Sequence, residues 1–160
     1  MKTKFALLAF VAACVALSAS AAASPAPGGP GKPTVTLNYL DVQTNGSATI
    51  PQNQRPKLGD RFWFQNNSYK WNGTKRGALF GHTDGTVVFL TATIGELSAV
   101  AYFPGGTLDA LGQINFNNPV NTLAIVGGTG RYATARGEVI VRSLGGPNSN
   151  KSAITVRLWM

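Results

Sequence analysis

The sequence predicts an all-β protein that folds as an eight-stranded antiparallel β-barrel. Glycine (19 residues) and proline (9) are plentiful and only 12% of residues are charged, a composition typical of short strands joined by tight turns. Segments with strand-like alternation follow one another about every ten residues, and no segment has the period of an amphipathic helix. A closed barrel is favoured because it leaves no exposed strand edge, and a β-sandwich is the alternative.

The first 23 residues have the features of a secretory signal peptide. Lys2 and Lys4 precede an apolar stretch over residues 5–17, and small residues lead to a cleavage site after Ala23. The apolar stretch is shorter than the roughly 20 residues that a membrane-spanning helix needs, so we expect secretion and no stable membrane insertion. A lipoprotein signal with attachment at Cys14 is less favoured, because apolar residues follow this cysteine.

A single domain is expected over residues 34–160, after a disordered linker rich in proline and glycine at residues 24–33. The first strand is expected near residues 35–41. A period of two places Asp41 on the same face as the apolar side chains of Leu37 and Tyr39. The polar segment 44–57, which contains two prolines, is predicted to be a long loop.

The remaining strands are separated by turn signals. The sequences at Asn72–Gly73, Asp84–Gly85 and Pro104–Gly106 are typical of hairpin turns, and a break in a strand is expected near Asn66 and Asn67. The last strand would place Met160 on the same apolar face as Ile154, Val156 and Leu158. Besides residues 35–41, the strand candidates are residues 61–69, 77–83, 86–94, 97–103, 107–116, 123–126, 136–144 and 152–160, which makes nine segments for a barrel of about eight strands.

A glycine-rich stretch follows the apolar residues 123–126 and has two possible interpretations. The sequence IVGGTG at residues 125–130 is similar to the start of a dinucleotide-binding loop. That fingerprint needs a third glycine about three residues after the second and an acidic residue about 20 residues later. Here the next glycine is Gly137 and no acidic residue follows Glu138. A tight turn between two strands is therefore predicted.

Four motifs, in this order, resemble those of dirigent proteins and allene oxide cyclases. They are LGD at residues 58–60, KRG at 75–77, GTLDALG at 106–112 and GGTGRYATARG at 127–137. The resemblance covers roughly residues 35–160. It implies an eight-stranded barrel that is usually a homotrimer, with an apolar cavity for a small hydrophobic molecule and with no metal or cofactor.

The resemblance also implies site residues, although the match is incomplete. Asp41 resembles the aspartate of the first dirigent strand, with Leu40 in place of a histidine. Asn66 matches the asparagine with which the cyclases hold a water molecule, and Thr83 stands where they carry a cavity cysteine. Ala133 replaces a dirigent arginine, so that Arg136 is the nearest match.

Asp41 is the candidate for acid–base chemistry, and three environments are open for it. An apolar barrel interior would raise its pKa and suit it to general acid catalysis, whereas Arg136 or Arg61 nearby would lower the pKa and form an orienting clamp. At a strand end, Asp41 would only cap a loop.

Asn66 would hold a water or a ligand oxygen, or else form a β-bulge. Tyr39, Phe64, Tyr102 and Phe116 would line a ligand pocket or simply fill the barrel.

Other chemistries are poorly supported. His82 is the only histidine, and no cysteine or acidic cluster accompanies it to form a zinc site. The basic residues are scattered, with one adjacent pair at Lys75 and Arg76, so a solvated basic surface is expected in place of a nucleic-acid site.

The resemblance therefore implies a secreted, cofactor-free barrel that binds a small hydrophobic molecule and steers the cyclisation or coupling of a reactive intermediate. The alternative is a non-catalytic binding module for a lipid, a phenolic compound or a glycan.

Overall fold

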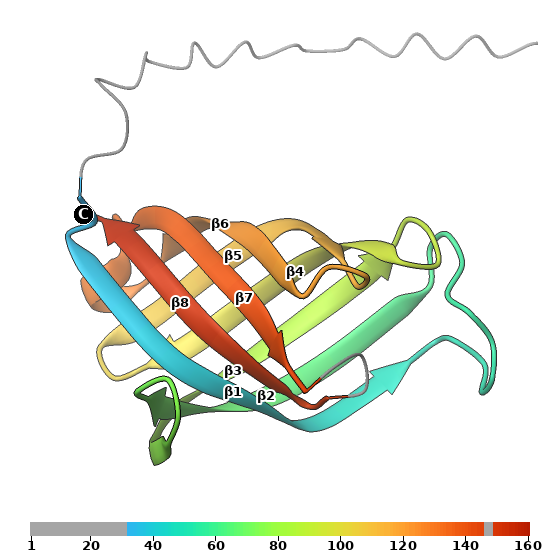
Figure 1. The fold of residues 1–160 in the computed structure, drawn as a ribbon. Helices are drawn as coiled ribbons and strands as arrows, with labels where there is room; N and C mark the ends of the chain where they lie inside the picture. The colour runs from blue at the N-terminus through green and yellow to red at the C-terminus, as the bar shows by residue number, and fades with distance from the viewer. Residues whose placement is uncertain (1–31, 146–148) are drawn as a thin grey trace, which may run out of the picture. The chain divides into compact units, whose positions relative to one another are not determined.

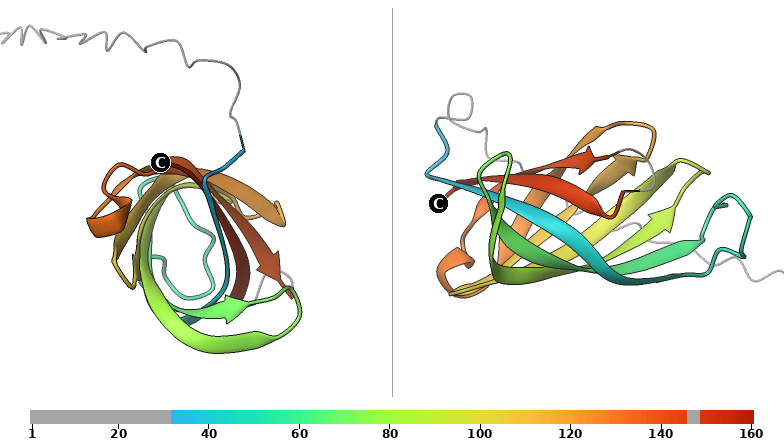
Figure 2. Two further views of the ribbon diagram at one scale, coloured as in Figure 1. Left: turned by 90° about the vertical axis from the view of Figure 1, so that its left-hand side faces the viewer. Right: turned by 60° about the horizontal axis from the view of Figure 1, so that its bottom comes forward.

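The computed structural model describes residues 32–145 and 149–160, which form a closed antiparallel β-barrel of eight strands (Figures 1 and 2). Each strand pairs with the next in the sequence, and β8 pairs with β1 to close the barrel. This confirms the predicted fold. The strands are β1 (Val35–Ala48), β2 (Arg61–Trp71), β3 (Arg76–Phe89), β4 (Ile94–Phe103), β5 (Gly106–Asn115), β6 (Val120–Gly128), β7 (Arg136–Leu144) and β8 (Lys151–Trp159).

Alternation along the strands decides which side chains fill the barrel. On β8, Ile154, Val156 and Leu158 are buried in the core, whereas the intervening Arg157 is exposed. The prediction that Met160 shares this face is wrong, because β8 ends at Trp159 and Met160 is 53% exposed beyond it.

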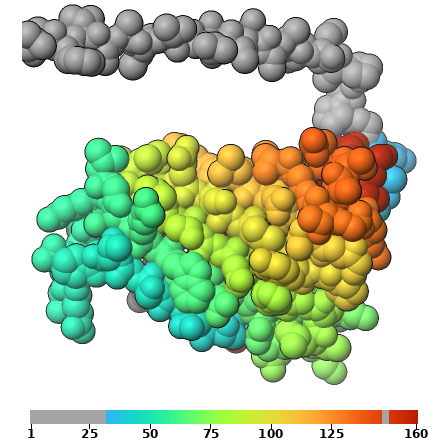
Figure 3. All heavy atoms as spheres, turned by 180° about the vertical axis from the view of Figure 1, so that it is seen from behind, coloured from blue at the N-terminus to red at the C-terminus, as the bar shows by residue number. Residues whose placement is uncertain are grey.

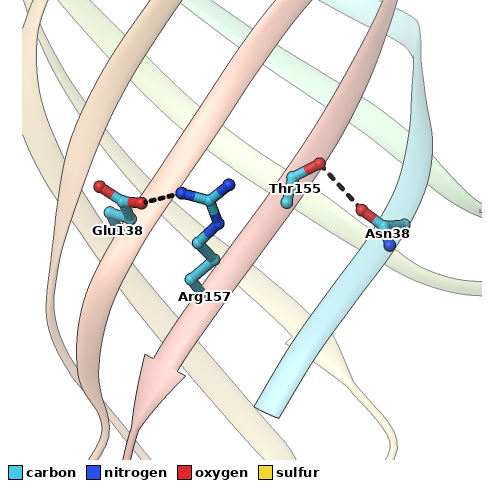
Figure 4. A network of polar contacts seen from close by, with 4 residues as sticks. All are labelled: Asn38, Glu138, Thr155 and Arg157. Atoms are coloured by element: carbon cyan, nitrogen blue, oxygen red, sulfur yellow. Dashed lines mark hydrogen bonds and ion pairs between the residues drawn. The ribbon is translucent and has the colours of Figure 1, made fainter. Parts of the chain in front are cut away.

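The outer face carries polar pairs between neighbouring strands (Figure 4). Arg157 on β8 forms an ion pair with Glu138 on β7 at 2.8 Å, and Thr155 Oγ1 donates to Asn38 Oδ1 on β1 at 2.9 Å. Both pairs join residues that lie opposite each other in the register. They support a register that turns the odd-numbered residues Tyr39 and Asp41 inward.

Strands β1 and β3 are longer than predicted. β1 continues to Ala48 through part of the expected loop, with a bulge at Thr44 where the register with β2 shifts. Asp84 and Gly85 do not form a turn, because β3 runs through them. Gly85 lies opposite Phe64, and a Cβ atom at this glycine would lie 2.3 Å from the Phe64 ring. The glycine therefore makes room for an aromatic ring inside the barrel.

The expected break at Asn66 and Asn67 is also wrong. Both residues pair regularly with β3, and the irregularity lies at Phe80, between the pairs Ser68–Gly81 and Tyr69–Leu79. The predicted turn at Asn72–Gly73 is confirmed, since it joins β2 to β3.

The glycine-rich stretch joins β6 to β7, as predicted, but the connection is longer than a tight turn: it spans residues 129–135 and includes a short 3₁₀ helix, η1 (Gly130–Tyr132). Gly106 and Gly130 have positive φ angles of 149° and 58°. The start of β5, with the β4–β5 connection before it, packs against the β6–β7 connection here. A Cβ atom at Gly106 would lie 2.1 Å from the carbonyl oxygen of Thr129, and one at Gly130 would lie 2.2 Å from that of Gly105, so only glycine allows this close packing.

The predicted signal peptide (residues 1–23) and most of the predicted linker (24–33) lie outside the described residues. Within residues 32–145 and 149–160, no helix is long and apolar enough to cross a membrane.

Candidate functional site

The barrel encloses a cavity of about 190 Å³ to which all eight strands contribute side chains. Most of its wall is apolar. The small side chains Ala99 and Ala101 on β4 and Ala110 on β5 leave space in the middle of the barrel. The polar lining residues are Asp41, Gln43, Asn66, Thr83, Ser149, Asn150 and Ser152.

The two ends of the barrel differ. At the end that carries η1, Tyr132 is 2% exposed and packs edge-to-face against Phe103, which also contacts Tyr39 and Phe80. This aromatic cluster closes the barrel. At the other end, the lining residues Phe116 and Asn150 are exposed, so the cavity opens to solvent there.

A polar cluster interrupts the apolar wall on β1, β2 and β3. Asp41 is 4% exposed and both its carboxyl oxygens accept hydrogen bonds. Ser68 Oγ donates to Oδ1 at 2.6 Å, and Asn66 Nδ2 donates to Oδ2 at 3.3 Å. Thr83 Oγ1 lies 3.4 Å from the Ser68 hydroxyl. Asn66 and Ser68 face the same way because they are two residues apart on β2.

Burial raises the pKa of Asp41 from 3.8 to about 6. Hydrogen bonds from Ser68, Asn66 and Thr83 act in the opposite direction, since they stabilise the carboxylate, but desolvation is the larger effect. Burial likewise raises the pKa of Tyr39 well above its usual value, with a further contribution from the charge of Asp41. Of the three environments considered from the sequence, the structure therefore has the apolar interior.

No arginine borders Asp41 among the residues that line the cavity. Arg136 is exposed at the start of β7, where its Nη1 donates to the carbonyl oxygen of Ala135 at 2.8 Å. The inward positions of β7 are those of Val139 and Val141, so alternation directs Arg136 outward. Arg61 is exposed at the start of β2. The clamp, one of the environments left open from the sequence, is therefore not formed, and Arg136, the expected charge partner, does not lie beside Asp41.

The predicted ligand-lining residues also fall into two groups, those that line the cavity and one that lies outside it. Tyr39, Phe64, Thr83 and Phe116 line the cavity. Tyr102 does not, because it alternates with the buried Ala101 and Phe103 on β4 and points outward. It is 39% exposed and stacks on His82 with 4.4 Å between ring centroids.

Ser68 is the functional candidate that sequence reasoning missed. It is fully buried and makes the shortest hydrogen bond to Asp41. The sequence does contain a signal for Ser68, because it lies two residues after Asn66 and so faces the same way on a regular strand. The expected strand break at Asn66 and Asn67 prevented this inference.

Among the described residues, no group of three or more His, Cys, Asp or Glu side chains is arranged to hold a metal ion. The polar groups that line the cavity are carboxyl, hydroxyl and amide side chains.

Comparison with known proteins agrees with this architecture. The model of the dirigent-like protein family matches residues 65–158, which is more than half of the chain. The chain belongs to the dirigent-like family. No curated protein sequence matches this dirigent-like chain significantly.

Solved structures similar to the dirigent-like barrel include enzymes and dirigent proteins. Pyocyanin demethylase is 20% identical with a TM-score of 0.65, over 78% of this chain and 100% of its own. The pterocarpan synthase dirigent protein GePTS1 is 17% identical with a TM-score of 0.61, over 81% and 85%. A Diels–Alderase from Streptomyces koyangensis is 17% identical with a TM-score of 0.62, over 78% and 64%. At these identities the likeness shows a shared fold.

Proposed function

We propose that this dirigent-like barrel binds a small hydrophobic molecule in its cavity and steers the cyclisation or stereoselective coupling of a reactive intermediate. The observation that carries the proposal is the buried Asp41, held inside an apolar cavity by two hydrogen bonds and with its pKa raised to about 6. A carboxyl group with a pKa close to the working pH is suited to both donating and accepting a proton.

The apolar walls would contribute by positioning the ligand. A reactive intermediate enclosed by side chains from every strand has few conformations in which to react, and enclosure also excludes water that would trap it. The restricted conformation of the intermediate and the exclusion of water would together determine which new bond the intermediate forms.

Asp41 would act as the acid. Its protonated carboxyl donates a proton to an oxygen of the ligand as a bond to that oxygen breaks or polarises, and the resulting carboxylate accepts a proton when the new ring or bond is complete. The carboxyl group begins and ends in the same state, so such a reaction consumes no cofactor.

Ser68 and Asn66 would position the acid and the ligand. Ser68 donates to Oδ1 of Asp41 and fixes the orientation of the carboxyl group. Asn66 Oδ1 is buried and has no hydrogen-bond partner among the described residues. Because an unpaired buried acceptor is costly, this oxygen would accept a hydrogen bond from a ligand hydroxyl or a bound water.

The comparisons support this proposal at the level of reaction class. The structural neighbours include a pterocarpan synthase dirigent protein and Diels–Alderases. By extension from the family, we also propose that the barrel is secreted and assembles as a homotrimer.

The first experiment is native mass spectrometry of the protein purified from its own source, which reports the cleavage site, the oligomer and any retained compound. The compound, or an analogue of its precursor, is then tested with Asp41→Asn. Loss of turnover by about 100-fold or more with binding retained is expected for a general acid.

Glu96→Gln is the matched control, because Glu96 is an exposed acid on β4 outside the cavity. Its turnover should equal that of the parent protein. An empty barrel with no affinity for apolar compounds would contradict the proposal.

A non-catalytic binding role is the second candidate. It is favoured by the departures Leu40 and Ala133 from dirigent positions and by the outward placement of Arg136. In that case Asp41→Asn would leave the fate of the bound compound unchanged.

A further inference from the structure

The barrel has a second concavity, on its outer surface, which among the described residues shares only Asn66 with the lining of the cavity. This outer groove has a volume of about 580 Å³ and crosses β1, β2 and β3. Figure 3 shows the side of the molecule on which the teal and green atoms of β2 and β3 face the viewer. The groove is lined by Thr44, Gln65, Asn66, Asn67, Leu79, Phe80, Gly81, His82 and Asp84.

Two β-bulges flank the groove. Thr44 is the extra residue between the pairs Gln43–Asn66 and Asn45–Gln65, and Phe80 is the extra residue on β3. Bulges increase the local twist of a sheet and change the direction of side chains. Phe80 stacks on Phe103 at 5.1 Å between centroids and lies edge-on to Tyr39, so its ring belongs to the aromatic cluster. The outer groove lies beside the bulge at Phe80.

The groove contains a carboxyl group without a partner. Asp84 lies between Thr83 and Gly85, whose buried positions face the barrel interior, so its side chain belongs to the outer face. Its Oδ1 atom is buried and makes no hydrogen bond within residues 32–145 and 149–160. A buried oxygen that lacks a donor is costly to the protein and is explained when a bound molecule supplies the donor.

Hydrogen-bonding amides lie beside this carboxyl group. Gln65 is opposite Asp84 in the β2–β3 register, and Asn67 is opposite His82. Within the described part of the chain, neither amide side chain has a hydrogen-bond partner. Each amide offers both a donor and an acceptor, so the groove can bind a ligand that carries several adjacent hydroxyl groups.

His82 and Leu79, both on β3, give the groove apolar surface. The ring of His82 is stacked on that of Tyr102, at 10° between ring planes, although Tyr102 itself is not a lining residue. Leu79 is 56% exposed. These residues present apolar surface beside the polar groups, which suits a ligand with an apolar face and a polar edge.

We propose that the outer groove is a binding site for a neutral saccharide. The described lining residues include no lysine or arginine, and Asp84 would repel an anion, which excludes phosphate and acidic polymers in spite of the basic net charge of +8. The unpaired carboxyl oxygen disfavours a purely apolar ligand. A sugar ring has C–H faces for His82 and Leu79 and hydroxyl groups for Asp84, Gln65 and Asn67.

The test titrates the full secreted protein, labelled with ¹⁵N, with cellohexaose, xylohexaose and chitohexaose separately. Binding of at least one hexasaccharide is expected, with the largest amide shifts in residues 65–67 and 79–84. The affinity should fall at least about tenfold, which is about 1.4 kcal/mol, in Asp84→Ala and in His82→Ala. His82 is exposed and outside the core, so its variant tests the site even if Asp84→Ala folds poorly.

Glu96→Gln is again the control and should bind the saccharide as the parent does. Apolar ligands of the cavity should bind equally well to both groove variants, which separates this site from the proposed function. The inference is overturned if no hexasaccharide binds or if the shifts fall elsewhere. It is also overturned if only putrescine, a small cation, binds at Asp84, or if the Asp84 variant changes the oligomer without any effect on saccharides.

Discussion

Asp41 shows how a single residue obtains its chemistry from its surroundings. Water would keep an aspartate ionised, but the cavity replaces water with aromatic and aliphatic side chains and leaves only Ser68, Asn66 and Thr83 to stabilise the charge. The hydrogen bonds are too few to offset the loss of hydration, so the pKa is raised. The protein accepts this cost at one position of an otherwise apolar wall.

Asp41 should make the stability of the protein depend on pH. Its pKa is about 6 in the folded protein and near 3.8 in the unfolded chain. Between these pH values the folded state holds a proton that the unfolded chain has lost, so the free energy of unfolding should decrease as pH rises through this window. The expected contribution is roughly 3 kcal/mol, present below pH ~4 and lost above pH ~6.

Denaturant unfolding at a series of pH values, carried out on the parent protein and on Asp41→Asn, measures this effect. The asparagine variant should lack this part of the slope, because its side chain does not ionise. Identical pH dependence in the two proteins would show that Asp41 titrates normally.

At the scale of elements, close approach between neighbouring strands depends on particular glycines. Gly137 on β7 lies opposite Leu158 of β8, and a Cβ atom there would lie 2.0 Å from the carbonyl oxygen of Arg157. Gly127 on β6 differs, because the nearest atom to an added Cβ is Asp109 Oδ2 at 3.6 Å. The two glycines look alike in the sequence but have different packing.

We therefore expect Gly137→Ala to destabilise the barrel by about 1–3 kcal/mol, because the backbones of β7 and β8 must move apart. Gly127→Ala is the matched control and should change the free energy of unfolding by only about 0.5 kcal/mol, as substitutions without a clash usually do. Thermal or denaturant unfolding of both variants measures the difference. Equal effects would mean that the contact at Gly137 relaxes without cost.

At the scale of the whole molecule, closure of the barrel makes the cavity. Eight strands place side chains from all directions around one interior, and small residues on β4 and β5 leave it incompletely filled. The aromatic cluster at Tyr132 fills one end of the barrel, and the exposed lining residues Phe116 and Asn150 lie at the other.

Filling the cavity should remove ligand binding while the fold remains. Ala110 lines the cavity, so the ring of Ala110→Phe would occupy the space that a ligand needs. Ala124→Phe adds the same ring on the exposed face of β6 and serves as the control. We expect a fluorescent apolar probe to bind to the parent and the control but not to Ala110→Phe. Circular dichroism checks the fold, and unchanged probe binding in Ala110→Phe would place the apolar site elsewhere.

The sequence was most informative where local chemistry determines structure. Turn signals at Asn72–Gly73 and Pro104–Gly106 located real hairpins, and a period of two correctly directed Tyr39 and Asp41 inward. The prediction of a turn at Asp84–Gly85 was wrong, because this dipeptide is compatible with a hairpin turn and also with a strand. In the strand, the glycine makes room for an aromatic ring of the neighbouring strand. Only the tertiary contact with Phe64 distinguishes them.

The sequence by itself determined the all-β class, the antiparallel order of strands and the family to which the chain belongs, since these depend on alternation, turns and glycine motifs. The tertiary structure alone decided that Ser68 meets Asp41, that Arg136 and Tyr102 point away from the cavity, and that Asp84 lies in an outer groove. The physical reason is that bulges and strand register set which residues of different strands come together, and a shift of one residue reverses the direction of every side chain that follows.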